Sequence, residues 1–385
     1  MNYEDLKKVL HEGSNLSLIF QLTDKCVLSC KYCFARGAHL GENPKVSDGL
    51  LERVISQSFT TKHNSVSFEW TGGEAFLMGK TFFESVLSFQ KRYATKPYTN
   101  GVQTSGYLFD KELIDFLVDN GFVISVTIDG TKAVHNANRP AQNNHESFDN
   151  VMKTRAYVEE KQGYCGFIST VTKNNLGKEK EILEFYRGLN ISSFHSNPYI
   201  FFEKNIVKDK SISLNEEEYA SYFIAQFNAW FEQGKLEPIP LTLDYFMKGL
   251  SLKMMPRQSL CVFGGRCLTN FLTVTPNGDC YTCPKFTGHT NMKLGNLYKG
   301  TIKEMIDEEI NEKMEQLVRQ RLLAIEKCEK SHCKFMYLCN AGCPYYSYIT
   351  SNGENISEKD ILCEGKTLLM EYLDSVNKAI VEGVI

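Results

Sequence analysis

The chain has 385 residues, 42% of them hydrophobic and 23% charged, with a formal net charge of −3, which is the composition of an ordinary globular protein. It has no basic stripe interleaved with aromatic residues, as nucleic-acid binding would favour, and no apolar run of the ~18 residues that a transmembrane helix needs. No apolar segment follows the charged N-terminus as it would in a signal peptide, so we expect a cytoplasmic protein without a membrane or nucleic-acid partner.

Strand-like and helix-like segments alternate through the first 200 residues. β-branched and apolar runs predict strands at 16–22, 65–70, 98–104, 122–128, 166–172 and 192–197. Apolar residues at helical spacing predict helices at 47–55, 80–92, 111–119, 147–161 and 178–189, after a short helical lead-in over residues 1–16. Such alternation implies a parallel sheet with right-handed crossovers. We therefore predict an α/β fold, a partial (β/α)6 TIM-like barrel over residues 1–200.

The second half of the chain changes character. Residues 201–256 read as a bridge, helical at 215–230 and 245–252, without a further strand–helix repeat. Residues 257–385 form a cysteine-rich region with a hairpin at 273–281, where Asn277-Gly278 is a turn signal. A charged helix over 301–327 and a terminal helix over 364–382 complete it.

Thirteen cysteines are distributed unevenly along the chain. Three fall between residues 26 and 33, nine fall between 261 and 363, and Cys165 stands alone. Cytosolic thiols stay reduced, so this clustering indicates metal sites rather than a disulfide framework. We interpret Cys165 as a small buried hydrophobic residue.

The first cysteine group is Cys26-x3-Cys30-x2-Cys33, directly after the first predicted strand. In barrels of this type active sites lie at the carboxyl ends of the strands. Three thiolates are one short of the four that saturate an iron–sulfur cluster or a structural zinc ion, which leaves one metal position open to a small molecule. The alternative, a zinc site, needs a fourth ligand, and the closest candidate is His39.

With the aromatic Tyr32 before its last cysteine, this motif resembles the radical S-adenosylmethionine superfamily. The resemblance implies a [4Fe–4S] cluster on Cys26, Cys30 and Cys33, with S-adenosylmethionine on the fourth iron. One electron from an external donor of flavodoxin or ferredoxin type would then cleave a C–S bond, and the 5′-deoxyadenosyl radical would abstract a substrate hydrogen. The cofactor supplies that chemistry, while the protein orients it and excludes water.

Three more stretches resemble cofactor-binding motifs of the same superfamily. Gly72-Gly73-Glu74 resembles the motif that meets the cofactor's amino group, with Ala75 in place of the usual proline. Residues 125–130 and 135–139 resemble stretches that supply a hydroxyl and an arginine to the cofactor carboxylate, a partner that arginine binds in bidentate fashion. The cofactor site implied by the resemblance consists of Tyr32, Gly72, Gly73, Glu74, Thr127 and Arg139.

The later cysteines resemble the SPASM extension, which carries two auxiliary [4Fe–4S] clusters and would bring the total to three. The pattern assigns one cluster to Cys261, Cys267, Cys283 and Cys343, and the other to Cys328, Cys333, Cys339 and Cys363. The second set opens with C-x4-C instead of the usual C-x2-C, and Cys280 competes with Cys283 as a ligand. A pair of zinc ribbons is the structural alternative, although paired C-x2-C knuckles are largely absent.

The layout is similar to that of anaerobic sulfatase-maturating enzymes and of maturases of ribosomally made peptides. In the former, the proposed base is an aspartate directly after the cysteine of a G-x4-C element. Here that position is Pro284, followed by Lys285. Because proline accepts no proton, we favour a peptide maturase that forms a crosslink or thioether or epimerises a residue.

Two alternatives stay open, formylglycine formation on a sulfatase and a non-catalytic iron–sulfur or zinc protein. The catalytic acid or base is unassigned. Lys285, Tyr281 and Asp129 are possible pocket groups, and residues 198–256 are a candidate leader-binding surface.

Overall fold

The computed structural model describes residues 15–34, 45–204, 209–234, 236–254, 261, 267–307 and 309–383. Within them, one sheet runs in the order β10-β9-β8-β1-β2-β3-β4-β5-β6-β7. Strands β1 to β7 are parallel neighbours, and β8 also pairs in parallel with β1. The strands are β1 (Asn15–Gln21), β2 (Ser65–Thr71), β3 (Tyr98–Gln103), β4 (Phe122–Thr127), β5 (Gly166–Val171), β6 (Ser193–Pro198), β7 (Ile239–Pro240), β8 (Phe271–Val274), β9 (Asp279–Tyr281) and β10 (Gly295–Asn296).

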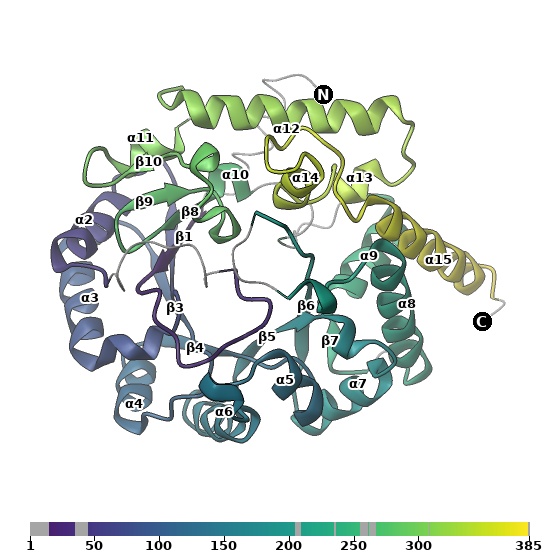
Figure 1. The fold of residues 1–385 in the computed structure, drawn as a ribbon, viewed down its shortest axis with the longest axis horizontal. Helices are drawn as coiled ribbons and strands as arrows, with labels where there is room; N and C mark the ends of the chain where they lie inside the picture. Colours follow the sequence, from purple (N-terminus) through teal and green to yellow (C-terminus); the bar gives the residue numbers. More distant parts are fainter. Residues whose placement is uncertain are drawn as a thin grey trace.

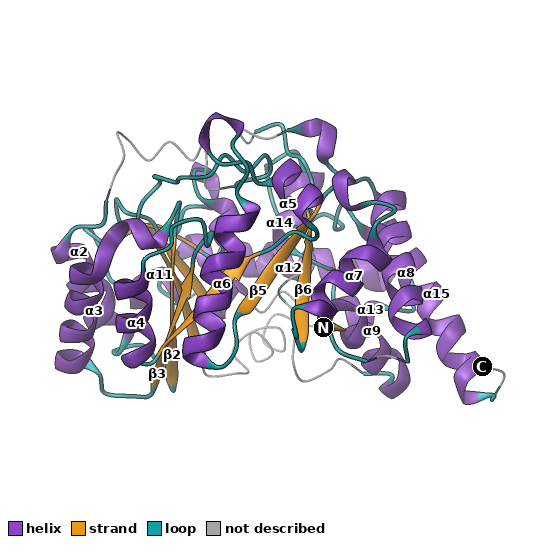
Figure 2. Ribbon diagram, turned by 90° about the horizontal axis from the view of Figure 1, so that it is seen from below, coloured by secondary structure: helices purple, strands orange, loops and turns teal. Residues whose placement is uncertain are grey.

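Helices surround the outer side of the curved sheet (Figure 1), and the view from below shows strands inside and helices outside (Figure 2). The predicted partial (β/α)6 TIM-like barrel is therefore confirmed. The helices are α2 (Asp48–Ser58), α3 (Gly79–Tyr93), α4 (Lys111–Asp119), α5 (Lys132–Asn138), α6 (Phe148–Gln162), α7 (Glu179–Gly188), α8 (Glu216–Glu232), α9 (Leu241–Leu252), α10 (Cys267–Asn270), α11 (Ile302–Ile306), α12 (Glu312–Lys330), α13 (Met336–Cys339), α14 (Pro344–Thr350) and α15 (Cys363–Val381).

Strand β2 shows how the sequence separates the two faces of the sheet. Its residues alternate because successive side chains of a strand point to opposite faces. Phe68 and Trp70 are fully buried against the helices, where their rings contact Phe59 at the end of α2 and Phe82 of α3. Burying such a side chain contributes roughly 1.5–3 kcal/mol. The intervening Glu69 faces the barrel interior.

The cysteine-rich region continues the barrel sheet. Strand β8 pairs with β1 from Ser17↔Phe271 to Phe20↔Val274, and β9 and β10 extend the sheet in antiparallel fashion. Gly278, in the predicted hairpin turn, has φ +80°, a left-handed conformation that favours glycine. The C-terminal region thus packs directly on the strand that leads into the first cysteine motif.

Several details differ from the predicted elements. The bridge contains one more short strand, β7, which pairs with β6 and precedes α9, so the prediction of no further strand–helix repeat was wrong. Strand β7 has only two residues, Ile239 and Pro240, which are too few to show the alternating pattern of a strand. The helix predicted over 301–327 is broken between α11 and α12, where Asn311 caps the second helix by accepting from the Met314 N–H. Helices α5, α10, α13 and α14 and the short strand β10 were not predicted, and residues 1–14 of the lead-in lie outside the described residues.

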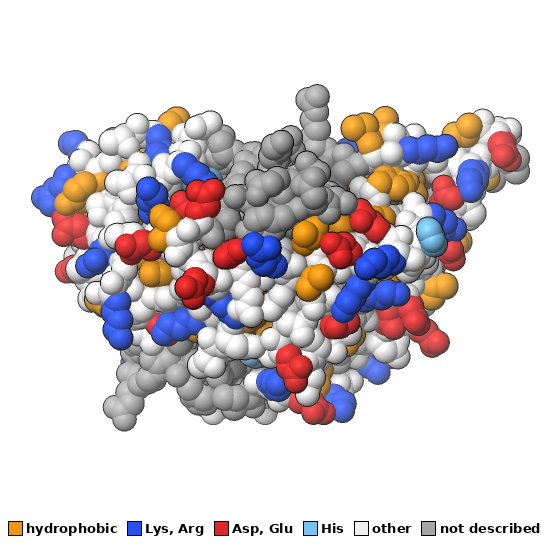
Figure 3. Space-filling model, turned by 90° about the horizontal axis from the view of Figure 1, so that it is seen from above, with side chains coloured by type: hydrophobic (Ala, Val, Ile, Leu, Met, Phe, Trp, Pro, Cys, Tyr) orange, Lys and Arg blue, Asp and Glu red, His pale blue; other side chains and the backbone are white. Residues whose placement is uncertain are grey.

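The surface is mixed in charge. On the face drawn in Figure 3, acidic and basic side chains are interspersed and hydrophobic side chains are scattered. This agrees with the small net charge of the chain. None of the helices in the described ranges has the length and apolar character required to cross a membrane.

Candidate active site and cluster-binding cysteines

The first cysteine motif opens onto a cavity at the carboxyl end of β1. Cys26, Cys30 and Cys33 line this cavity of about 670 Å³, together with Gly73 of the next strand's loop. Burial raises the pKa of the Cys26 thiol to about 11 and that of the Cys30 thiol to about 12. Three sulfur donors facing one roomy cavity fit a cluster with an open metal position.

A neighbouring segment holds the cysteine loop in place. The Ser29 N–H donates to the Pro140 carbonyl at 2.7 Å, and the Lys31 N–H donates to the Asn138 carbonyl at 3.0 Å. A further antiparallel bridge joins Leu28 to Ala141. The cysteine loop and the segment that follows α5 therefore form one unit, which brings Arg139 close to the cysteines.

Two glycines after β2 allow the next loop to press against the same unit. Gly72 has φ +134°, and a Cβ on Gly73 would lie 2.2 Å from the Lys25 carbonyl oxygen. The Gly73 N–H donates to the Thr23 carbonyl at 2.7 Å. Only glycine permits this approach, so the Gly-Gly pair places backbone groups at the cavity beside Cys26.

The carboxylate of Glu74 is buried and saturated by the protein. It accepts from the Phe76 N–H at 3.1 Å, the Thr104 hydroxyl at 2.6 Å, the Ser105 N–H at 3.0 Å and the Ser105 hydroxyl. A carboxylate has about four acceptor positions, and here all are used. The side chain thus ties the loop after β2 to the loop after β3, and the Gly72-Gly73 backbone is left to meet a cofactor amino group.

Tyr32, Asp129 and Arg139 form a buried hydrogen-bonded triad. The Tyr32 hydroxyl donates to Asp129 Oδ2 at 2.6 Å, and Arg139 Nη1 donates to the Tyr32 hydroxyl at 2.8 Å. Burial raises the pKa of the Asp129 carboxyl although Arg139 opposes it. Arg139 Nε has no partner among the described residues, so this guanidinium has a donor available for a carboxylate at the site.

Thr127 stands at the end of β4 and faces the interior. Its hydroxyl accepts from Gln103 Nε2 at 3.2 Å, which links the ends of β3 and β4. The sequence-predicted cofactor residues Tyr32, Gly72, Gly73, Glu74, Thr127 and Arg139 therefore all lie at or beside the carboxyl ends of β1 to β4 or in the loops that follow. Their contact with S-adenosylmethionine stays a prediction.

Four of the later cysteines form a second group. Burial raises the pKa of Cys283 to about 12, and Cys261 and Cys343 add to the shift. The pKa of Cys267 is raised by burial and by the nearby Cys261, Cys283 and Cys343. Cys280 interacts instead with Asp279 and Lys293, and its thiol donates to the Gly278 carbonyl at 3.6 Å. Geometry therefore favours Cys283 over Cys280 as the fourth sulfur of this group.

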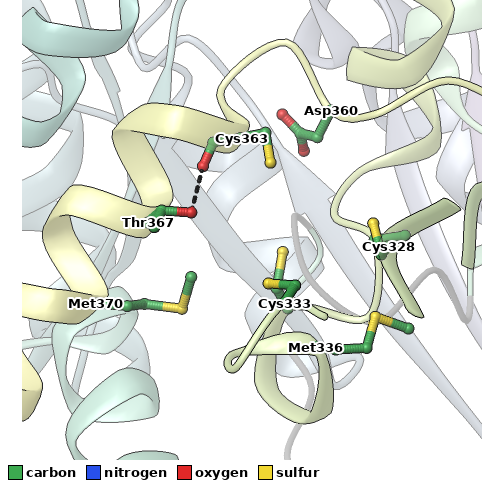
Figure 4. Close-up of a pocket in the computed structure, with 9 residues that line it drawn as sticks. Cys328, Cys333, Met336, Asp360, Cys363, Thr367 and Met370 are labelled. Carbon is green, nitrogen blue, oxygen red and sulfur yellow. Dashed lines mark hydrogen bonds between the residues drawn. The ribbon is translucent and has the colours of Figure 1, made fainter. Parts of the chain in front are cut away.

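The remaining cysteines face a small cavity between α12, α13 and α15. Figure 4 shows Cys328, Cys333 and Cys363 around it, with Asp360 at the rim. Cys339 lines the same cavity. Four sulfur donors suit a closed cluster, in contrast to the three-sulfur site. Within the described ranges, no three His, Cys, Asp or Glu side chains are arranged to hold a single metal ion.

Buried charges join the two later cysteine groups. Asp360 Oδ2 accepts from the Cys343 N–H at 2.8 Å and from Lys366 Nζ at 2.6 Å, in an ion pair almost inaccessible to solvent. Arg321 is fully buried and donates to the carbonyls of Asn340, Ala341 and Gly342. Those three residues all have positive φ, so Arg321 and Asp360 fix a left-handed segment between Cys339 and Cys343.

Two family models match the chain. The Radical SAM superfamily matches residues 20–186, and the SPASM iron–sulfur cluster-binding domain matches residues 261–334. The chain therefore contains a radical SAM domain followed by a SPASM domain. S-adenosylmethionine and iron–sulfur clusters are accordingly its cofactors. Cys339, Cys343 and Cys363 lie beyond the matched residues, so their role rests on the geometry above.

Curated relatives and solved structures align with nearly the whole enzyme. A cysteine-type anaerobic sulfatase-maturating enzyme of Clostridium perfringens is 26% identical over 364 residues, 92% of this chain and 95% of the relative. A serine-type enzyme of Bacteroides thetaiotaomicron is 25% identical, over 88% and 84% of the two chains. Native anSMEcpe with bound AdoMet has a TM-score of 0.83 at 22% identity, covering 96% of this chain and all of the other. Streptococcus suis SuiB bound to its precursor peptide SuiA has a TM-score of 0.63 at 16% identity, over 94% and 78%.

Several residues of the site were not found by sequence reasoning. The hydrogen bond between Tyr32 and Asp129 joins residues 97 positions apart. The sequence motifs pointed to each of these residues separately but not to their contact. Arg321 and Lys366 each occupy a charged, helical stretch that reads as solvent-exposed. The one signal for Lys366 was its position three residues after Cys363, and Arg321 had no comparable signal.

Proposed function

We propose that this radical SAM/SPASM enzyme abstracts a hydrogen atom from a residue of a ribosomally synthesised peptide, which then forms a crosslink, a thioether or an epimerised residue. The observation that carries this choice is Pro284, which follows Cys283 at the start of a short 3-10 turn. The resembled sulfatase-maturating enzymes have an aspartate there. Proline accepts no proton, so the position lacks the base that formylglycine formation requires.

The next residue, Lys285, does not replace that base. Its ammonium lies over the rings of Tyr346 and Tyr345, at 4.9 and 5.5 Å from their centroids. Burial would lower the pKa of Lys285, but Coulombic interactions with Cys343, Cys283 and Cys261 outweigh it and raise the pKa. A protonated lysine donates protons and does not remove them. Pro284 and Lys285 thus favour products that need no carboxylate base after Cys283.

We assign three [4Fe–4S] clusters to the enzyme. Cys26, Cys30 and Cys33 hold the one that binds S-adenosylmethionine, which when bound supplies the 5′-deoxyadenosyl radical. The first auxiliary set is Cys261, Cys267, Cys283 and Cys343, and the second is Cys328, Cys333, Cys339 and Cys363. Around the cofactor, Arg139 and the Gly72-Gly73 backbone orient its charged groups. A donor of flavodoxin or ferredoxin type delivers the electron.

A peptide as substrate has support from proteins of similar fold. Solved structures of anSMEcpe contain bound AdoMet with the peptides Cp18Cys or Kp18Cys, and SuiB is bound to a precursor peptide. We propose that the substrate of this chain is likewise a peptide and that it binds in the barrel opening near the carboxyl ends of the strands, beside the cavity at Cys26.

Formylglycine formation is the second candidate. It is favoured by one observation, the alignment of cysteine-type and serine-type sulfatase-maturating enzymes with most of this chain. It would require a base other than residue 284 to take the proton from the substrate thiol or hydroxyl.

One experiment separates the two candidates. The anaerobically reconstituted and reduced enzyme is incubated with S-adenosylmethionine and either a peptide encoded beside its gene or a sulfatase-motif peptide. Our proposal predicts 5′-deoxyadenosine with loss of two hydrogens from the former peptide, or deuterium uptake in heavy water if it epimerises. An aldehyde on the sulfatase peptide would establish formylglycine formation instead. If no 5′-deoxyadenosine forms and zinc replaces iron, a non-catalytic protein is indicated.

A further inference from the structure

Glu69 lies in the wall of the barrel interior, two residues before the end of β2. Its strand neighbours are Ile19 of β1 and Gly101 of β3. The flanking Phe68 and Trp70 point to the helices, so the carboxylate points inward. At ~3.3 Å per residue, it stands about 7 Å below the carboxyl end of the strand.

The carboxylate of Glu69 has no hydrogen-bond or ion-pair partner in the described part of the chain. Glu74, five residues later, has four donors. Polar side chains one layer below Glu69 bond to one another instead, since the Ser67 hydroxyl accepts from Asn15 Nδ2 at 3.1 Å and from the Thr99 hydroxyl at 3.2 Å. The walls of the barrel partly desolvate this carboxylate, which raises the pKa of Glu69. The side chain is nevertheless solvent-exposed, so its carboxylate is accessible to a ligand of opposite charge.

The surroundings leave room for such a ligand. A Cβ on Gly101 would lie only 2.4 Å from Glu69 Oε2, so the carboxylate extends over the glycine into the space that a side chain there would fill. Val123 and Ile168 alternate with core residues of β4 and β5, yet they are 39% and 38% exposed. Both therefore face the solvent-accessible interior of the barrel, as Glu69 does.

We propose that Glu69 binds the ammonium or guanidinium group of a lysine or arginine in the peptide substrate. The inference rests on the proposed function, because it names the class of peptide that the site takes. A cationic head group gives Glu69 the charge-assisted hydrogen bonds that the protein does not supply. The long apolar stem of either residue spans the depth between the strand ends and the carboxylate.

The test measures binding separately from catalysis. Two random heptapeptide pools, one with central lysine and one with central norleucine, are dialysed to equilibrium against the reconstituted enzyme with S-adenosylmethionine. A second pair compares central arginine with citrulline. The wild-type enzyme should retain at least one cationic pool on the order of tenfold better than its neutral counterpart. Glu69→Gln should reduce that preference to near unity.

Two controls separate recognition from folding. Glu112→Gln removes an exposed carboxylate on α4 and should keep the preference. Glu69→Gln should unfold at about the same temperature as the wild type, because the carboxylate is solvent-exposed and has no hydrogen-bond partner among the described residues. A clear loss of stability would indicate a structural role and contradict the proposal.

Two outcomes would overturn the proposal. In the first, the wild-type enzyme retains the charged and neutral pools equally, whatever the amount retained. In the second, Glu69→Gln keeps the wild-type preference for the charged pool. Radical formation is measured separately as 5′-deoxyadenosine released without peptide, and it should be the same in the wild type and in Glu69→Gln, because Glu69 lies outside the predicted cofactor residues. The proposed function is judged by hydrogen loss or deuterium uptake in the peptide encoded beside the gene, so its failure is distinguishable from failure of the Glu69 proposal.

Discussion

The hydroxyl of Tyr32 donates a 2.6 Å hydrogen bond to Asp129 and accepts one of 2.8 Å from Arg139. Tyr32, the aromatic residue of the cysteine motif, therefore contributes a hydrogen-bonded hydroxyl as well as its ring. It connects the cysteine loop to the residue after β4 and to the arginine after α5, so three loops of the candidate cofactor site share one buried contact.

Tyr32→Phe keeps the ring and removes this contact. Leaving Asp129 and Arg139 without their shared partner should destabilise the apoprotein by about 1–3 kcal/mol. Weaker S-adenosylmethionine binding should follow, since the Arg139 side chain loses its orientation. Urea unfolding and equilibrium binding measure the two effects. Tyr164→Phe, at a residue 53% exposed, is the matched control, and an equal effect of both variants would argue against the triad.

The two nearby cysteines of the hairpin should differ in iron content. Cys283→Ala should remove about four irons per chain because it breaks the first auxiliary set. Cys280→Ala should keep its iron, since its thiol bonds to Gly278 in the core. Iron and sulfide analysis of the reconstituted variants checks this. Loss of iron in Cys280→Ala alone would reverse the assignment.

Arg321 should be required for the segment between the auxiliary sets. Arg321→Met leaves three buried carbonyls without their donor, and hydrogen bonds from a charged group contribute about 1.5–3 kcal/mol each. We expect a lower unfolding midpoint of the apoprotein and loss of iron at both auxiliary sets. Arg321→Lys should retain part of the unfolding midpoint and part of the iron content that Arg321→Met loses. Arg319→Met, on the exposed face of α12, should leave iron content unchanged.

His195 should make stability depend on pH. Burial lowers its pKa from 6.5 to about 4, so between these values the unfolded chain binds a proton that the folded chain does not. The contribution of neutral His195 to the free energy of unfolding is therefore complete above pH 6.5 and is lost as the pH falls toward 4. From about pH 7.5 to about pH 5.5 the loss should be about 1 kcal/mol. Urea unfolding at both pH values should show a smaller difference for His195→Gln than for the wild type.

The barrel could be predicted because its strands are β-branched and its helices amphipathic, as in β4 and α4. Chemistry concentrated in a short motif, such as Cys26 to Cys33, was equally visible. Contacts between distant segments were not. Glu74 reads as a cofactor ligand in sequence, yet the loop after β3 saturates its carboxylate. In the sequence, Arg321 has the pattern of a surface charge. In the fold, it is buried and donates to the carbonyls of residues 340–342. Strand β7, which ends at Pro240, was likewise not predictable, because only its pairing with β6 defines it as a strand.

The pairing of β1 with β8 sets an order of assembly. Residues 17–20 meet residues 271–274, so one edge of β1 has no strand beside it until most of the chain has been synthesised. Contacts of such long sequence separation form late, because loop closure must come first. The loop that carries Cys26, Cys30 and Cys33 follows this same strand. Its cluster is therefore best inserted after synthesis, and a chain that ends before residue 271 would expose an unpaired edge prone to aggregation.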